Sequence, residues 1–229
     1  MSVTTAPLPQ PVAIGALRPT LPVWGLFGRV LLVGLGTILI VPTPWTVTYL
    51  YRFLCEHITL PDGRRLRFTG QPGDIWYVLI AASAFAWIHG LAEHAEFPHH
   101  LGLIWTVALA ALTVRIFKWF CVNLKSEDDR LALAFEGGYW AYIGWHLLLI
   151  VSVITIVGWA WVGKYMLQWI CRNVRGTVGF DFTGTGPALL WRVLVTVLLS
   201  ILIIPIPWIH RWLANWFISQ ISVVEPSRA

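Results

Sequence analysis

The chain has 229 residues, of which 57% are hydrophobic and only 12% are charged, and its formal net charge is +5. Soluble domains carry about 25% charged residues, so this composition argues against an ordinary water-soluble domain and favours a chain with lipid as its solvent. The fifteen Trp residues fit the aromatic belts at membrane interfaces, and the excess of Lys and Arg fits the positive-inside rule. Nucleic acid is therefore not an expected partner.

The chain opens with a Pro- and Ala-rich segment, residues 1–21, which we expect to be a flexible tail because it lacks the residue order of a signal peptide. Residues 22–224 form one predicted transmembrane domain. Its four apolar stretches are interpreted as repeat units, at residues 22–57, 74–124, 139–173 and 187–221. Each stretch is interrupted near its middle by Pro or Gly, which end or weaken helices. The interruptions lie at residues 42–45, 93–100, 158–163 and 205–208.

A short pattern recurs within these stretches and indicates an internal repeat. Three Trp residues are each followed ten positions later by an apolar residue, in the pairs Trp45 and Cys55, Trp161 and Cys171, and Trp208 and Ile218. Cys121 occupies the same slot in a looser copy that lacks the Trp. Because the slot accepts both Cys and Ile, we predict that the cysteines are packing residues rather than metal ligands or a disulfide.

Three polar loops separate the stretches, and each contains an aromatic residue shortly before a Gly, at residues 66–70, 133–137 and 180–184. Their alternation of apolar and polar residues predicts a short strand, so each loop is expected to be a small β-hairpin or extended segment. If the loops are equivalent, they lie on one side of a membrane, and each stretch must cross it an even number of times. The distribution of Lys and Arg then predicts that the loops and both termini are cytoplasmic.

The predicted fold class is an all-α integral membrane protein of internally repeated helical hairpins, with about eight short helices in four hairpins and short β-like cytoplasmic loops. Residues 45–58 would reach only about 21 Å as a helix, less than the roughly 30 Å hydrocarbon core. An alternative therefore stays open, in which five helices span the membrane and the segments after each Trp lie flat as interfacial helices.

The repeat unit resembles the YjgN-like inner-membrane family, a domain of unknown function. The residues that carry the resemblance are 182–186, then 204–208, and in the first unit 44–45 followed by 62–70. The likeness covers nearly the whole chain from about residue 22, although this chain is short and has fewer basic residues after its Trp breaks. The resemblance implies a multi-pass protein of the bacterial inner (cytoplasmic) membrane, and it supplies no activity and no catalytic residues.

The densest polar cluster, at the interruption of the second stretch, is a candidate metal site. His94, Glu96, His99 and His100 lie close together around Pro98, and His and Glu are ligands that suit zinc or copper. The competing interpretation is a solvated turn between two helices.

Two other histidines, His89 and His146, are embedded in apolar sequence, where an ionisable residue is a functional candidate. Either could ligate haem or chlorophyll, or it could be a neutral histidine bonded to a neighbouring helix. The basic run of Arg64, Arg65 and Arg67 is expected to contact anionic lipid headgroups.

No nucleophile elbow, zinc-protease motif or phosphate loop occurs in the sequence, so we predict no catalytic residues and no enzyme activity. The favoured function is a non-enzymatic accessory or scaffold subunit of a larger membrane complex, with membrane lipids and other membrane-protein subunits, or copies of itself, as partners. The alternative is a small oligomeric transporter or channel that uses the broken helices as its pathway.

Overall fold

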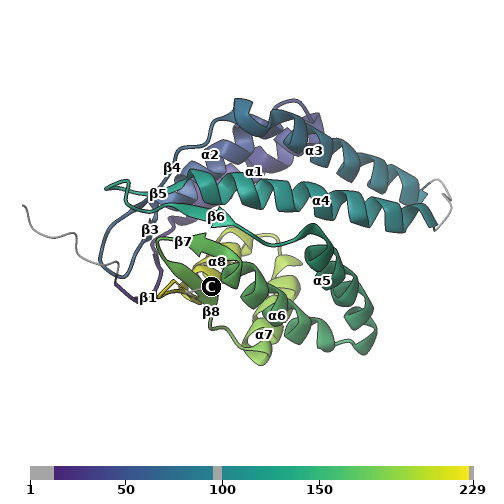
Figure 1. The fold of residues 1–229 in the computed structure, drawn as a ribbon. Coiled ribbons are helices and arrows are strands. Elements are labelled where there is room, and N and C mark those ends of the chain that lie inside the picture. The colour runs from purple at the N-terminus through teal and green to yellow at the C-terminus, as the bar shows by residue number, and fades with distance from the viewer. Residues whose placement is uncertain (1–12, 95–99, 227–229) are drawn as a thin grey trace, which may run out of the picture.

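The computed structural model describes residues 13–94 and 100–226, apart from the side chains of residues 89, 91–94 and 100–106. This part of the chain forms eight α-helices (Figure 1). They are α1 (Val23–Leu39), α2 (Thr43–Glu56), α3 (Pro72–His94), α4 (His100–Asn123), α5 (Tyr139–Ser152), α6 (Gly158–Arg172), α7 (Gly186–Ser200) and α8 (Ile206–Ser219), with a 3₁₀ turn η1 (Val153–Thr155) after α5.

Consecutive helices pack together as four hairpins, α1 with α2, α3 with α4, α5 with α6 and α7 with α8. In the first and last hairpins the second helix starts at a proline pair, because Pro44 and Pro207 occupy the first turn, where a backbone N–H is not needed. In the third hairpin the turn is closed by Thr155, whose hydroxyl accepts a hydrogen bond from the Gly158 N–H at 3.0 Å.

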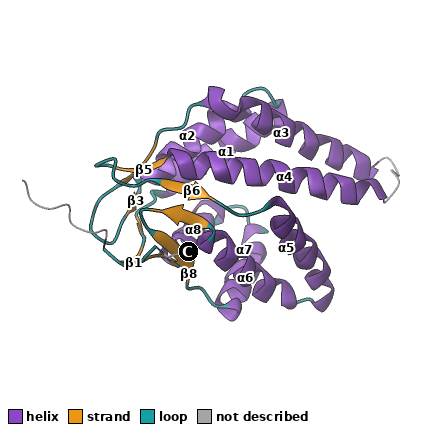
Figure 2. Ribbon diagram, in the orientation of Figure 1, coloured by secondary structure: helices purple, strands orange, loops and turns teal. Residues whose placement is uncertain are grey.

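Short strands flank every hairpin at its open end and gather at one side of the molecule (Figure 2). They are β1 (Gly15–Ala16), β2 (Arg18–Pro19), β3 (Ile58–Thr59), β4 (Leu66–Phe68), β5 (Leu124–Ser126), β6 (Leu133–Phe135), β7 (Val174–Gly176), β8 (Gly179–Phe182) and β9 (Ile221–Val224). The strand before each hairpin pairs antiparallel with the strand after it: β2 with β3, β4 with β5, β6 with β7 and β8 with β9.

The expectation of a β-hairpin within each loop is therefore wrong for these ladders, whereas the alternative of an extended segment agrees with the strands. Within the first loop, an isolated antiparallel bridge joins Thr59 to Arg65. Phe68 pairs with Leu124, and Phe135 pairs with Val174, so each ladder joins strands on either side of a helical hairpin. The physical reason is geometric: the two helices of a hairpin bring the chain back to its starting point, where the flanking strands can satisfy each other's backbone groups.

The same packing recurs at the base of the last three hairpins, where a strand-end aromatic ring lies against a glycine. A Cβ atom added at Gly70 would lie 2.6 Å from Cζ of Phe68 and 2.7 Å from Cζ2 of Trp119. Equivalent contacts join Gly137 to Phe135 and Gly184 to Phe182. The glycines of the polar loops are thus the positions where the rings of the core need room.

The four hairpins form a closed ring, because α2 packs on α3, α4 on α5, α6 on α7, and α8 returns to α1. Each even-numbered helix also packs on the strand that begins the next unit, and α8 packs on β2 of the first unit. The largest buried side chains, including Leu60, Leu131 and Phe182, cluster near the strands. The core therefore lies at the base of the hairpins, and their far ends are less well covered.

The three cysteines lie in this basal core, as buried free thiols. Burial raises the pKa of Cys55, of Cys121 and of Cys171 to about 12. Such thiols are protonated at neutral pH and pack as small apolar groups.

No helix in the described parts of the chain is both long enough and apolar enough to cross a membrane. This finding overturns the predicted transmembrane spans, in the favoured form with eight crossings and in the alternative with five. The six helices of the first, third and fourth units have 14–17 residues, or about 21–26 Å, less than the roughly 30 Å of a bilayer core. The interruptions by Pro and Gly divide stretches of sufficient length into helices that are too short.

Two further predictions fall with the spans. The fold class is not an all-α integral membrane protein, since the described residues also form small antiparallel sheets. The localisation in a bacterial inner membrane, with loops and both termini on the cytoplasmic side, depended on those spans and is corrected for the same reason.

Candidate functional site

The predicted metal site falls largely outside the described residues. Glu96 and His99 lie outside them, and so do the side chains of His94 and His100. Within the part of the chain that is described, no cluster of three or more His, Cys, Asp or Glu side chains could hold a metal ion. The metal site therefore stays a prediction.

The side chain of His89 also lies outside the described residues, whereas that of His146 is half-buried on α5. Its Nδ1 atom is buried and has no hydrogen-bond partner among the described residues. The imidazole ring lies 6.1 Å from the ring of Tyr142, centroid to centroid. Haem or chlorophyll ligation by these two histidines stays a prediction.

Two members of the basic run are paired with carboxylates from another loop. Arg64 bonds Asp62 and Asp128, and Arg67 donates to Asp129 at 2.9 Å. Hydrogen bonds from Ser126 and Arg64 lower the pKa of Asp128 to about 2, so it is ionised at neutral pH. These pairs hold the loop after β5 against the loop before β4. The contact of Arg64, Arg65 and Arg67 with anionic lipid headgroups stays a prediction.

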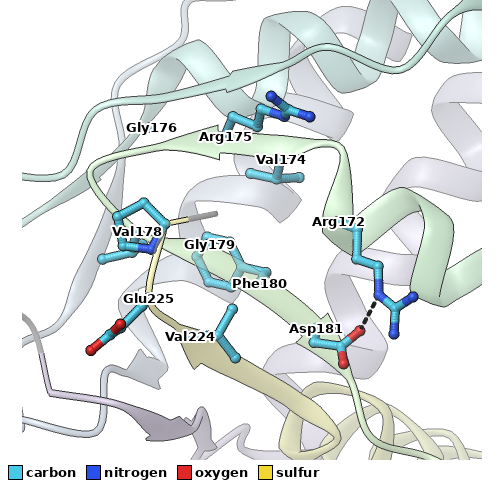
Figure 3. Close-up of a pocket in the computed structure, with 11 residues that line it drawn as sticks. Arg172, Val174, Arg175, Gly176, Val178, Gly179, Phe180, Asp181, Val224 and Glu225 are labelled. Carbon is cyan, nitrogen blue, oxygen red and sulfur yellow. Dashed lines mark hydrogen bonds and ion pairs between the residues drawn. The ribbon is translucent and has the colours of Figure 1, made fainter. Parts of the chain in front are cut away.

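A shallow hollow of about 420 Å³ lies among β7, β8 and β9 (Figure 3). The Arg172–Asp181 ion pair, 3.1 Å long, lies at one side of it and Glu225 at the other. Arg175, also on the rim, bonds Glu136 at 3.2 Å. Because both cations already have acidic partners, this hollow offers no unpaired cation to an anionic ligand.

A second, more open groove of about 480 Å³ runs along α8, where the fourth unit meets the first. Pro19 of β2 forms part of its wall, and the remaining lining residues are on α8: Trp208, Arg211, Trp212, Asn215, Trp216 and Ser219. The only ionisable side chain among these residues is that of Arg211. The hollow among β7, β8 and β9 is lined by both cations and anions, whereas the charge that lines this groove is positive only.

Two arginines that sequence reasoning did not single out lie among aromatic rings within the helical hairpins. The Arg29 guanidinium lies 3.9 Å from the ring centroid of Phe53, and that of Arg192 lies 4.4 Å from Trp216. Stacking of this kind stabilises a cation where water is scarce. Both arginines stand sixteen positions before the Trp of their unit, and this shared spacing was a signal for them.

The ends of the third and fourth hairpins expose a dense group of apolar side chains. Their exposed fractions reach 82% at Ile154, 81% at Ile156, 74% at Ile203 and 81% at Ile204. Isolated apolar residues are normal on a protein surface, but contiguous apolar patches indicate an interaction site. We call these two ends, residues 153–157 and 201–204, the apolar tips.

The turns at these ends are strained. Ile156 and Ile203 have φ values of 64° and 58°, and Ile40 at the first hairpin has φ of 63°. A β-branched residue in the left-handed region is a rare and unfavourable choice where Gly would be relaxed. All three isoleucines stand five positions before the Trp of their unit, so the repeat keeps an apolar side chain at a position that disfavours it.

Comparison with known protein families, with curated protein sequences and with solved structures found no match to this chain. The resemblance to the YjgN-like family therefore stays a prediction, and the proposals below depend on the geometry of this chain alone.

Proposed function

We propose that the protein is a non-enzymatic accessory or scaffold protein that docks on a lipid surface through its apolar tips. The opposite end of the molecule, where the strands and ion pairs lie and which we call the strand end, is then presented to partners. The observation that carries the proposal is the group of highly exposed isoleucines at the ends of the third and fourth hairpins. Docking of this kind buries apolar side chains in the outer part of one leaflet and needs no helix that crosses the bilayer.

The distribution of charge supports lipid over a protein partner. Residues 30–51, 137–163 and 193–210 contain no Lys, Arg, Asp or Glu, so three hairpin ends are free of charge. A protein interface normally has a polar rim around its apolar centre, whereas acyl chains tolerate no charge. The strand end, by contrast, carries the ion pairs of Arg64, Arg67 and Arg172.

The spacing of the first cations from the tips fits the depth of one-sided insertion. Lys164 and Arg211 each lie about two turns or less into the second helix of their hairpin, which places them roughly 10 Å from the tip. Helices that bind at the interface bury their apolar face by ~5–10 Å. At that depth the two cations would lie at the level of the phosphates, and exposed rings such as Trp161 and Trp208 would lie at the interface, which Trp favours.

The test is binding of the full chain to phospholipid vesicles, measured by flotation. Ile156→Asn and Ile203→Asn each place a polar side chain at a tip, and Asn tolerates the left-handed backbone of the turn. We expect each variant to bind about tenfold more weakly, because burial of an isoleucine contributes ~1.5–3 kcal/mol and 1.4 kcal/mol is a factor of ten.

Val122→Asn is the matched control. Val122 is 55% exposed. It lies in the last turn of α4, next to β5, at the opposite end of its hairpin from the turn. Its replacement should leave vesicle binding unchanged. The proposal is wrong if the tip variants bind vesicles as tightly as wild type does. It is also wrong if the protein does not bind vesicles and instead buries its tips in a stable oligomer.

A further inference from the structure

Among the described residues, the groove along α8 brings together an arginine without an acidic partner and an amide oxygen without a hydrogen-bond donor. The docking of the apolar tips uses the charge of the arginine but not this combination. Arg211 and Asn215 are four residues apart on α8 and both line the groove, so their side chains lie on the same face of the helix. Together they define a polar centre in a wall that is otherwise mainly tryptophan.

Arg211 is held in place by one bond and keeps most of its donors. Its Nε atom donates to the carbonyl oxygen of Leu21 at 2.6 Å, which ties α8 to the segment before α1. A guanidinium has five N–H donors in a planar fork, so the terminal nitrogens remain for a ligand. Among the described residues, no carboxylate forms an ion pair with Arg211 and none lines the groove. A fork of this shape matches phosphate and carboxylate oxygens.

Asn215 needs a hydrogen-bond donor from the ligand, whereas Arg211 offers donors to it. Its Oδ1 atom is buried and has no hydrogen-bond donor among the described residues. A buried acceptor without a partner costs roughly 1–3 kcal/mol, so a ligand that brings a hydroxyl or ammonium donor is favoured here. A simple anion such as inorganic phosphate would accept hydrogen bonds from Arg211 only. A headgroup that has both an anionic group and a hydrogen-bond donor can bond to both side chains.

The tryptophans define the rest of the ligand. Trp208, Trp212 and Trp216 recur every four residues and form an apolar stripe that runs from the tip of the fourth hairpin toward the strands. Arg192 lies behind this stripe, 4.4 Å from the ring of Trp216 and 5.6 Å from that of Trp212. It adds positive charge near the groove, and the stripe offers an apolar track toward the tip. An acyl chain can pack along this apolar stripe, whereas a free polar ion gains nothing from apolar contact.

We infer that this groove binds the headgroup of a phospholipid whose phosphodiester meets Arg211 and whose hydroxyl or ammonium donor meets Asn215, with phosphatidylglycerol as the probe of that chemistry. The inference rests on the proposed docking of the tips and deepens it, because it assigns a headgroup preference to the same lipid surface. Phosphatidylcholine has the phosphate but lacks the donor, so it is the discriminating comparison.

The experiment measures binding of the full chain to vesicles of phosphatidylcholine alone and to vesicles that also contain phosphatidylglycerol. Wild type should prefer the mixed vesicles, and Arg211→Gln should weaken binding to the mixed vesicles about tenfold, as expected for the loss of a charge-assisted hydrogen bond to the phosphodiester. Asn215→Leu leaves the bond between Arg211 and Leu21 in place, so it tests the site even if Arg211→Gln fails to fold. It should reduce the preference for the mixed vesicles, because it removes the acceptor for the donor that phosphatidylcholine lacks.

Lys164→Gln is the matched control for charge. Lys164 stands three positions after Trp161, as Arg211 stands three positions after Trp208, but it is not part of the groove. A general attraction between cations and anionic lipid contributes about 1 kcal/mol per charge and would make the two variants equivalent. Equal losses for Lys164→Gln and Arg211→Gln would overturn the inference, and a larger loss for Arg211→Gln together with a loss for Asn215→Leu would support it.

Two further outcomes separate the possible failures. Wild-type binding that is equal for both vesicle types would refute the headgroup site and leave the docking of the tips intact, since the tip variants lower binding to both types. Calorimetric titration with glycerophosphoglycerol, the free headgroup, should give no binding comparable to that of vesicles. Tight binding of the free headgroup would reassign the groove to a water-soluble phosphodiester and would overturn the lipid assignment.

Discussion

At the residue scale, the glycines of the polar loops have different tasks although they look alike in the sequence. Gly70 has no room for a side chain, because a Cβ atom would lie 2.6–2.8 Å from the rings of Phe68 and Trp119. We expect Gly70→Ala to lower the free energy of unfolding by ~1–3 kcal/mol, the usual cost of overpacking a rigid core. Chemical denaturation followed by far-UV circular dichroism measures this.

Gly73 is the control for that substitution. It lies three residues away in the first turn of α3, and a Cβ atom added there meets no other atom within 4 Å. Gly73→Ala should leave stability unchanged or raise it slightly, since Ala is the better helix former. Equal losses for the two variants would show that the ring contacts at Gly70 are not what limits this loop.

Asp128 makes the loop after β5 sensitive to acid. Ser126 donates to its carboxylate at 2.5 Å, and Arg64 adds an ion pair, so its pKa is lowered to about 2. A carboxylate whose pKa is lower in the folded state stabilises the fold above its unfolded pKa of ~3.9, and the contribution is lost as the pH falls through the folded value. We therefore expect the melting temperature to fall between about pH 4 and pH 2.

Asp128→Asn should remove this part of the pH dependence and lower the melting temperature at neutral pH. Glu127→Gln is the comparison, because Glu127 is an exposed carboxylate in the same loop. If melting curves of the Asp128→Asn variant keep the acid dependence of wild type, the network of Ser126, Arg64 and Asp128 does not contribute to it.

At the element scale, the hairpin turns combine strain with exposure, and the two can be separated by mutation. Ile156→Gly and Ile203→Gly relieve the left-handed backbone of the isoleucines and should raise the free energy of unfolding by about 1 kcal/mol. They also remove an apolar side chain from a tip, so vesicle binding should weaken about tenfold. Thermal melting and flotation of the same preparations measure both effects.

A gain in stability with a loss of binding would agree with strain that is kept at a functional position. Stabilisation without any loss of binding would indicate that the isoleucines serve only the turn, and the tips would then lose their role in the proposal. The arrangement of three equivalent turns allows the comparison to be repeated with Ile40→Gly in the first hairpin.

At the scale of the whole molecule, the ring explains why four imperfect repeats form one body. A single hairpin with its pair of short strands leaves much of its apolar surface uncovered, and stacking on the neighbouring unit covers it. The contact of α8 with α1 and β2 closes the series, and the bond from Arg211 to Leu21 crosses this seam. The seam also forms the α8 groove, so closure of the ring creates the candidate site.

The same ring gives the molecule two unlike ends. The strands, the aromatic core and the ion pairs lie at one end, and the apolar tips lie at the other, a helix length away. This polarity follows from connectivity, because every strand is attached to the base of a hairpin. The proposed docking on a lipid surface would use this polarity directly.

Some of this architecture was readable from local chemistry. Pro42 and Pro205 mark hairpin turns because proline restricts its own backbone. The Phe and Gly of the polar loops mark strand ends because the Phe ring packs against a Gly only two residues further along the chain. The internal repeat also identified Cys55 and its equivalents as packing positions, since a slot that accepts Ile does not need a thiol.

Other predictions failed because they depended on distance or on helix length. The loops were expected to be β-hairpins or extended segments, and pairing within a loop was the wrong alternative for Phe68, which pairs with Leu124 across a whole helical hairpin. The basic run did not indicate that Arg64 pairs with Asp128, sixty-four residues away; its contact with lipid headgroups stays a prediction. Composition suggested spans, and the turn geometry determined that the helices of three units are too short for them.

The amino-acid sequence by itself determined the repeat, the helix breaks, the absence of charge at three hairpin ends and the small apolar slot of the cysteines, because each follows from side chains and their neighbours along the chain. Only the tertiary structure decided which strands pair, that the units close into a ring, and that Arg211 and Asn215 line a groove in which no described residue is acidic. Those features require residues far apart in the chain to meet, and no local pattern specifies which of many possible partners will be there.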